Sequence, residues 1–135
     1  MAGEVRAPWL RAAILAGLAY FLVGRLFAVA GQHARAWRLA AWTVSGSIYA
    51  LHFGYERARL RHPPRAIALH VALAVAIGAF ALALALMMRS VAATGSLGPK
   101  WLLALVLFPA ASALPAFLVA LVAGVAMSRG TDTVA

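Results

Sequence analysis

The stretch RAIALHVALAVAIGAFALALALMMR, residues 65–89, decides the fold class of this chain. Between Arg65 and Arg89 the run is apolar, and His70 is its only polar side chain. A helix of about 20 apolar residues crosses the hydrocarbon core of a bilayer. Each unpaired backbone amide in lipid costs several kcal/mol, so a spanning segment must satisfy its own hydrogen bonds. Residues 66–88 are therefore expected to form a transmembrane helix.

Three more apolar stretches accompany this one, at residues 12–30, 39–55 and 101–127. They lack the alternation of polar and apolar residues that is typical of a membrane β-barrel. The sequence predicts an all-α polytopic membrane protein, a four-transmembrane-helix bundle with short loops, as one integral membrane domain over residues 1–135. Small residues at 28–30 resemble a signal-peptide cleavage site, so removal of the first segment is an alternative.

The composition supports a lipid environment. Of the 135 residues 65% are hydrophobic and 11% charged, whereas soluble domains carry about 25% charged residues. The net charge is +9, but the basic residues lie at the ends of the apolar runs, where they meet anionic head groups. We therefore expect anionic lipid, and not nucleic acid, as a partner. The chain has no cysteine, which excludes disulfides and thiolate chemistry.

The basic residues also predict an orientation. With four spans, both termini lie on the same side of the membrane. The opposite side holds Arg35, Arg38, Arg89 and Lys100, and the side with the termini carries more basic residues than that. The positive-inside bias places both termini in the cytoplasm of a bacterial-type inner membrane. Four arginines lie in one cytoplasmic loop and are expected to bind lipid phosphate or an acidic partner: Arg57, Arg59, Arg61 and Arg65.

Small side chains indicate where helices pack. In the last apolar run they recur at every fourth position, which lets another backbone approach closely; these are Ser112, Ala116, Ala120, Gly124 and Ser128. Gly46, Ala50 and Gly54 repeat the pattern in the second run. The partner helix lies either in this chain, in a second copy or in another membrane subunit. Pro109 and Pro115 are expected to bend the last helix.

Polar groups inside a membrane are costly and are therefore functional candidates. Ser45, Tyr49, His52 and Glu56 are spaced i, i+4, i+7 and i+11, which places them on one face of the second helix. Glu56 is the only acid away from the chain termini. Arg25 lies within the first run and either extends to the outer interface or faces the bundle, where it would bind an anion or a carbonyl.

In an antiparallel hairpin His52 and His70 reach nearly the same depth, which leaves several alternatives. They are candidate axial ligands of a b-type haem, with loop arginines pairing the propionates. With Glu56 they match a two-histidine, one-carboxylate metal site, and imidazoles also relay protons. The plainest alternative is a hydrogen-bonded histidine beside a Glu56 that pairs with Arg57, Arg59 or Arg61.

The sequence contains no motif of a soluble-type catalytic site, such as Gly-x-Ser-x-Gly, a P-loop or His-Glu-x-x-His. The leading expectation is thus an oligomer-forming or accessory membrane subunit without its own catalysis. One alternative is a transporter or channel for a solute, an ion or protons that uses Arg25 and the His52/Glu56 face. A second alternative is an electron-transfer subunit that binds haem or another cofactor through His52 and His70.

Overall fold

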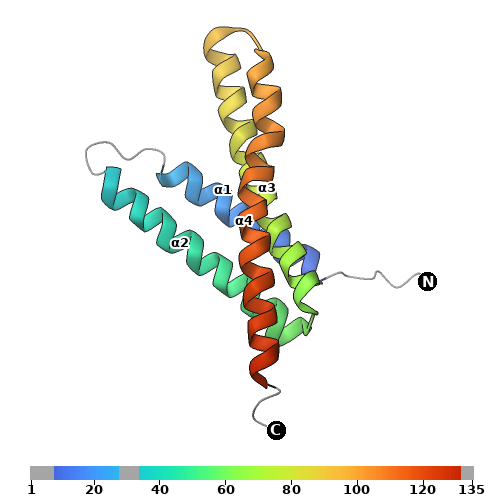
Figure 1. The fold of residues 1–135 in the computed structure, drawn as a ribbon. Helices are drawn as coiled ribbons and strands as arrows, with labels where there is room; N and C mark the ends of the chain where they lie inside the picture. Colours follow the sequence, from blue (N-terminus) through green and yellow to red (C-terminus); the bar gives the residue numbers. More distant parts are fainter. Residues whose placement is uncertain (1–7, 28–33, 132–135) are drawn as a thin grey trace, which may run out of the picture.

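The structure, a computed structural model, describes residues 8–27 and 34–131. The chain is all-α, as predicted, and Figure 1 shows its helices. The element order is α1 (Pro8–Phe27), α2 (Ala34–Tyr55), a π-helical segment η1 (Glu56–Leu60), α3 (Pro64–Thr94) and α4 (Pro99–Thr131). Residues 28–30, the small residues that resemble a cleavage site, lie outside the described residues.

Three of the four long helices are long and apolar enough to cross a membrane: α1, α3 and α4. The prediction of membrane-capable helices is confirmed for these three and is compatible with a multi-pass protein. The described part of α2 does not reach the same apolarity. Its 22 residues include Arg35 and Arg38 near the start and hydroxyl side chains at Thr43, Ser45 and Ser47.

The helices extend beyond the apolar runs, because local signals set their ends. Pro64 occupies the first turn of α3, where a missing backbone N–H costs nothing. The same helix ends at Gly95, whose φ of 69° lies in the left-handed region and whose N–H donates to the Val91 carbonyl at 2.8 Å. Helix α4 runs through Pro109 and Pro115 without a break.

Figure 1 shows that α3 and α4 form an antiparallel hairpin, with α1 lying across α3 and α2 diverging from the hairpin. The beginning of α1, the end of α2, η1, the beginning of α3 and the later half of α4 lie near one another. At the opposite end α2 and the hairpin are far apart. The convergent end holds the buried cluster of Phe53, Ile67, Val71 and Ala120.

Helices α1 and α3 approach closely through glycines. A Cβ atom built on Gly78 would lie 2.8 Å from the Gly17 carbonyl oxygen and 2.6 Å from the Tyr20 Cβ. A Cβ on Gly17 would lie 2.7 Å from the Ile77 side chain. Such close contact maximises dispersion between helices, which matters in lipid because little hydrophobic driving force remains there. The Gly17–Gly78 seam is a packing site that the sequence analysis did not single out.

The small residues of α4 divide into two groups. Ala120 is fully buried in a cluster with Phe53, Ile67 and Val71, and a Cβ on Gly124 would lie 2.9 Å from the Pro64 side chain. Their partner is therefore α3 of the same chain. Ser128 donates to the Gly124 carbonyl within α4. Ser112 and Ala116 instead line a groove of about 750 Å³.

This groove lies between the α1/α2 pair and the α3/α4 hairpin, and residues from all four helices line it, including Tyr20, Ser45 and Gly46. Tyr49 also lines the groove, and its hydroxyl donates to the Ala116 carbonyl at 2.7 Å. A Cβ on Gly46 or on Gly54 would meet no atom within 4 Å. The small residues of α2 are thus not packed against a described helix at these two positions.

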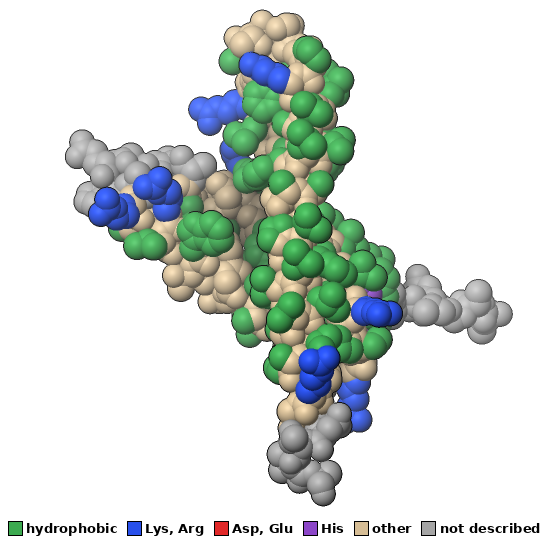
Figure 2. All heavy atoms as spheres, viewed as in Figure 1, with side chains coloured by type: hydrophobic (Ala, Val, Ile, Leu, Met, Phe, Trp, Pro, Cys, Tyr) green, Lys and Arg blue, Asp and Glu red, His purple; other side chains and the backbone are tan. Residues whose placement is uncertain are grey.

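The outside of the described molecule suits lipid. In Figure 2 hydrophobic side chains cover the visible face of the α3/α4 hairpin, and the Lys and Arg side chains lie mainly toward the ends of the helices. No acidic side chain is visible among the coloured residues, since Glu56 is fully buried. The one carboxyl side chain of the described residues is therefore held in the interior.

Candidate functional site: a carboxylate among histidines

Glu56 is the centre of the candidate site. It is the first residue of η1, its side chain is 0% exposed, and it is the only acid in the described ranges 8–27 and 34–131. Moving a carboxylate out of water is costly unless it is paired and hydrogen-bonded. The neighbours of Glu56 therefore define what the site can do.

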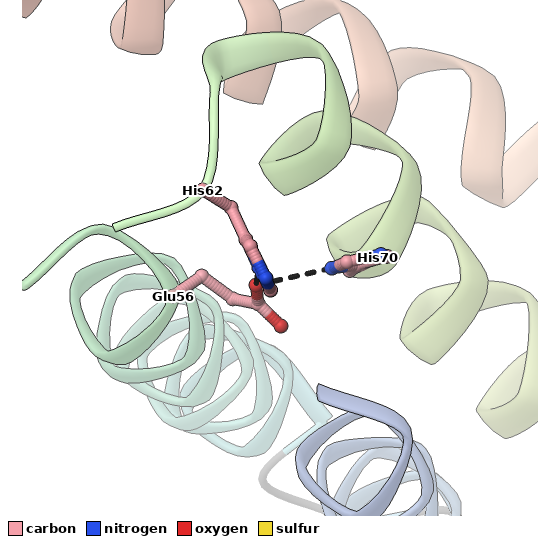
Figure 3. Close-up of side chains that lie close together, drawn as sticks. All are labelled: Glu56, His62 and His70. Atoms are coloured by element: carbon pink, nitrogen blue, oxygen red, sulfur yellow. Dashed lines mark hydrogen bonds and ion pairs between the residues drawn. The ribbon is translucent and has the colours of Figure 1, made fainter. Parts of the chain in front are cut away.

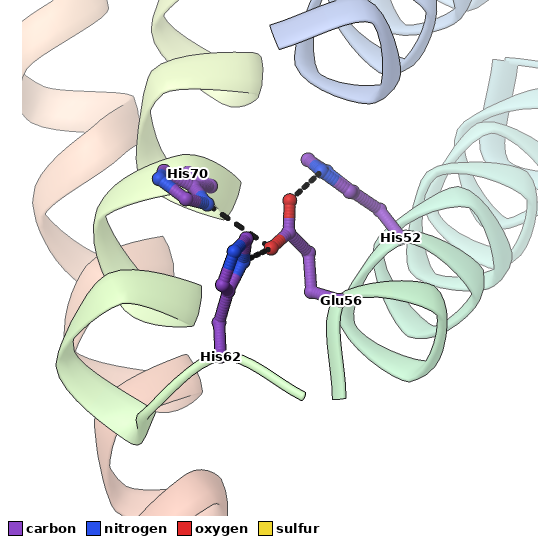
Figure 4. Close-up of polar contacts among 4 residues, drawn as sticks. All are labelled: His52, Glu56, His62 and His70. Carbon is purple, nitrogen blue, oxygen red and sulfur yellow. Dashed lines mark hydrogen bonds and ion pairs between the residues drawn. The ribbon is translucent and has the colours of Figure 1, made fainter. Parts of the chain in front are cut away.

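Three imidazoles surround this carboxylate (Figures 3 and 4). Its Oε2 lies 2.5 Å from Nδ1 of His62 and 3.0 Å from Nδ1 of His70. With Nδ1 protonated, both rings donate a hydrogen bond to that oxygen. The third ring, His52, lies on the other side, with Nε2 at 3.6 Å from Oε1, which is too long for a hydrogen bond.

The turn between η1 and α3 brings His62 back onto Glu56. Arg61 adopts a left-handed conformation with a φ of 53°, and its N–H bonds the Glu56 carbonyl. Pro63 and Pro64 then begin α3, because proline fixes φ and lacks the N–H that would continue the preceding helix. His62 consequently folds over the end of α2 although it lies six residues beyond Glu56.

Helix α1 contributes the aromatic wall of the site. The Trp9 ring stacks on His70, with centroids 4.2 Å apart and an interplanar angle of 10°. His62 meets the same imidazole edge-on at 5.1 Å. His70 is thus held between an indole, a second imidazole and the carboxylate, and its orientation follows from all three contacts.

Two buried polar groups in the site lack a hydrogen-bond partner. Neither nitrogen of His52 has one, although the residue is only 5% exposed, and Oε1 of Glu56 has none either. Buried polar atoms are nearly always satisfied, and each exception calls for an explanation. Of these atoms, Nε2 of His52 and Oε1 of Glu56 lie 3.6 Å apart, so each retains an unused capacity for a hydrogen bond.

Of the residues singled out in the sequence, His52, Glu56 and His70 come together. The contacts of Glu56 in the described chain are with histidines, and no ion pair links it to Arg57, Arg59 or Arg61. His62 and Trp9 were not predicted as site residues. The only available signal for His62 was its place in a tight Pro-Pro turn directly after Glu56.

The remaining candidates lie elsewhere. Ser45 and Tyr49 line the groove next to the site, whereas Arg25 is exposed in the last turn of α1. Sixteen residues of helix separate Arg25 from Trp9, about 24 Å at 1.5 Å per residue. The four loop arginines surround the turn, and three of them are exposed: Arg59, Arg61 and Arg65.

His52 and His70 do not face each other across an open space. The Glu56 carboxylate lies between the two rings and contacts both (Figure 4). A b-type haem needs its porphyrin plane between two axial imidazoles, and here that position holds a side chain. We therefore do not propose haem for this pair.

The fold and the site together define a helical, membrane-compatible protein with a buried carboxylate–imidazole cluster at the convergent end of its helices. Comparisons with known protein families, curated proteins and solved structures find no match for the chain.

Proposed function

We propose that this protein is a small membrane transporter or channel whose ion is a cation bound at Glu56. The observation that carries the proposal is one fully buried carboxylate in an otherwise basic described chain, with three imidazoles around it. A buried negative charge favours a cation, because the low dielectric strengthens their attraction. Ionisable groups within membrane proteins typically mark ion pathways.

In this proposal α2 is the fourth span, with its polar face turned away from lipid. Support comes from Ser45 and Tyr49, which line the groove, and from His52 and Glu56, which are buried further along the same face. The groove then forms the approach to the site from the opposite end of α2. The positive-inside bias places both termini and the Glu56 cluster on the cytoplasmic side of a bacterial-type inner membrane.

Flux measurements in proteoliposomes test this function. Vesicles containing the full chain and a trapped divalent-cation or pH indicator are expected to respond faster than empty vesicles when a cation gradient is applied. Glu56→Gln removes the charge at nearly constant volume and is expected to reduce the rate to the empty-vesicle level. Tyr55→Phe is the matched control, since it removes an exposed hydroxyl from the adjacent position. A rate that is unchanged in Glu56→Gln would contradict the proposal.

A second candidate function, self-assembly as a membrane subunit, is favoured by the groove itself. Its walls include Gly46, Ala111, Ser112 and Ala116, and the small residues of α2 at Gly46 and Gly54 have open space above them. Small residues on both walls suit a transmembrane helix that approaches closely. We propose a helix of a second copy of this chain as the occupant.

The oligomeric state in mild detergent tests self-assembly. Gly46→Leu adds a side chain to the groove wall at a position where a Cβ meets no atom of this chain within 4 Å, so it is expected to convert dimers to monomers. Gly54→Leu is the control, because it also points into open space but does not line the groove. Gly124→Leu is unsuitable, since Pro64 of the same chain occupies that space. Equal masses of wild type and Gly46→Leu would contradict a dimer formed through the groove.

A further inference from the structure

The geometry of the cluster specifies which cation it takes. We infer that Glu56, His62 and His70 form a binding site for a borderline divalent transition metal, Zn²⁺, with His52 as the residue that positions the carboxylate. This inference rests on the proposed cation-binding role of Glu56 and names the chemical class of its ion.

The three ligand atoms already converge. One carboxylate oxygen of Glu56 and one ring nitrogen each of His62 and His70 all lie within 4.8 Å of one another. Around a tetrahedral Zn²⁺ with bonds of about 2.0–2.2 Å, neighbouring ligand atoms are about 3.3 Å apart. The Oε2–Nδ1 distances of 2.5 and 3.0 Å need to widen by only about 0.3–0.8 Å to reach that spacing.

A metal ion would take the place of the hydrogens that now lie between the rings and the carboxylate. In both rings Nδ1 is the nitrogen that faces Oε2 of Glu56. The same Nδ1 atoms, once deprotonated, would bind the metal through their lone pairs. The neutral imidazole binds metals through either nitrogen. The ring of His70 is held in this orientation by Trp9, so little side-chain entropy remains to be lost when the ion binds.

The donor set selects among metals. Hard cations such as Mg²⁺ and Ca²⁺ require several oxygen ligands, and the described chain offers one carboxylate here. Two imidazoles and a carboxylate suit Zn²⁺ and its first-row neighbours. Three protein ligands leave a fourth position open, which is typical of sites that exchange a ligand and not of closed structural sites. An exchangeable ion is what a transport role requires.

His52 explains the unpaired oxygen. Its ring lies 3.6 Å from Oε1 of Glu56, and both are buried without a hydrogen bond. Metal-ligating carboxylates are themselves hydrogen-bonded by outer residues. When Oε2 moves to bind the ion, a small rotation of the carboxylate brings Oε1 toward Nε2 of His52, which then donates to it. His52 thus acts through Glu56 and does not belong to the three converging ligands.

Metal titration of the full-length protein tests the site. The protein is purified in mild detergent without a polyhistidine tag, stripped with EDTA, and titrated with Zn²⁺ against a chromogenic chelator. One Zn²⁺ per chain is expected, and Co²⁺ should give the visible absorption of a four-coordinate ion. Glu56→Gln, His62→Asn and His70→Asn should each weaken binding by more than about 100-fold, since even outer-shell changes cost about 10–100-fold.

His33, which lies outside the described residues, provides a control. His33→Asn removes the remaining histidine of the sequence and should leave the affinity for Zn²⁺ unchanged. His52→Leu should weaken binding by about 10–100-fold, and His52→Gln, which keeps a hydrogen-bond donor, should restore most of that loss. If His52 serves only to fill space, the Leu and Gln variants will bind equally well.

Tryptophan fluorescence locates the ion without changing a ligand. Bound Co²⁺ should quench Trp9, because that indole stacks on His70. Trp9→Phe should bind Co²⁺ but lose that part of the quenching. Absence of Zn²⁺ binding at micromolar concentrations in the wild type, or binding lost only in His33→Asn, would overturn the site. If Zn²⁺ does not bind but another cation crosses the membrane in a Glu56-dependent way, the proposed function stands and only the zinc site is wrong. If Zn²⁺ binds tightly but no cation crosses the membrane, the zinc site stands and only the transport function is wrong.

Discussion

Replacing Gly78 by alanine places a methyl group into a close contact between α1 and α3. The new Cβ would lie 2.6 Å from the Tyr20 Cβ and 2.8 Å from the Gly17 carbonyl oxygen. Neither atom is the free end of a flexible side chain, so α1 and α3 must move apart. Overpacking of this kind costs about 1–3 kcal/mol, and the contact with backbone puts Gly78 near the upper value.

Helix propensity opposes this loss, because alanine is favoured over glycine by about 1 kcal/mol within a helix. The net effect expected for Gly78→Ala is a free energy of unfolding lowered by about 2 kcal/mol. Gly46→Ala is the matched control, since its Cβ meets no atom within 4 Å, and it should raise stability by up to about 1 kcal/mol.

Denaturant unfolding in mild detergent, followed by tryptophan fluorescence and far-ultraviolet circular dichroism, measures both variants. The two substitutions are chemically identical and should shift the midpoint in opposite directions. If Gly78→Ala is as stable as Gly46→Ala, then α1 and α3 do not approach through these glycines, and the packing argument is wrong.

Three further substitutions test other parts of the structure by the same unfolding measurement. Tyr49→Phe removes the hydroxyl that donates to the Ala116 carbonyl and should cost about 0.5–1.5 kcal/mol; an unchanged midpoint would argue against this link between α2 and α4. Glu56→Ala, measured in EDTA, leaves the partly buried imidazoles of His62 and His70 without their acceptor and should cost about 1–3 kcal/mol, so a more stable variant would show that the carboxylate destabilises the metal-free protein. Gly95→Ala forces a side chain into a φ of 69° and should cost about 1–2 kcal/mol, although no atom lies within 4 Å; a smaller effect would indicate that the α3–α4 turn adjusts.

The candidate site could be predicted in part. Spacing along one helix places His52 and Glu56 on the same face, and an antiparallel connection brings His70 near them, because helix geometry is regular. His62 could not be placed in this way, since it follows a π-helical segment and a left-handed Arg61 that no periodicity reveals. Trp9 comes from a helix distant in sequence, and its stacking on His70 depends on how α1 crosses α3.

Packing partners were likewise beyond the sequence. A repeat of small residues predicts that another helix packs closely against that face. The repeat does not specify which helix, because any helix with a complementary surface could pack there. In the structure Ala120 and Gly124 pack against α3, and Ser112 and Ala116 line the groove. A close seam also forms at Gly17 and Gly78, which belong to neither repeat of small residues. Only the relative positions of helices determine which small residues meet.

The sequence by itself determined the all-helical fold and the apolar helices, because a long run without polar groups can satisfy its backbone in lipid only within itself. Tertiary structure decided the rest: which described histidines surround Glu56, which glycines allow close packing, and where a groove remains. These features depend on contacts between segments up to tens of residues apart, and the energy of such a contact is a property of the assembled pair and not of either segment alone.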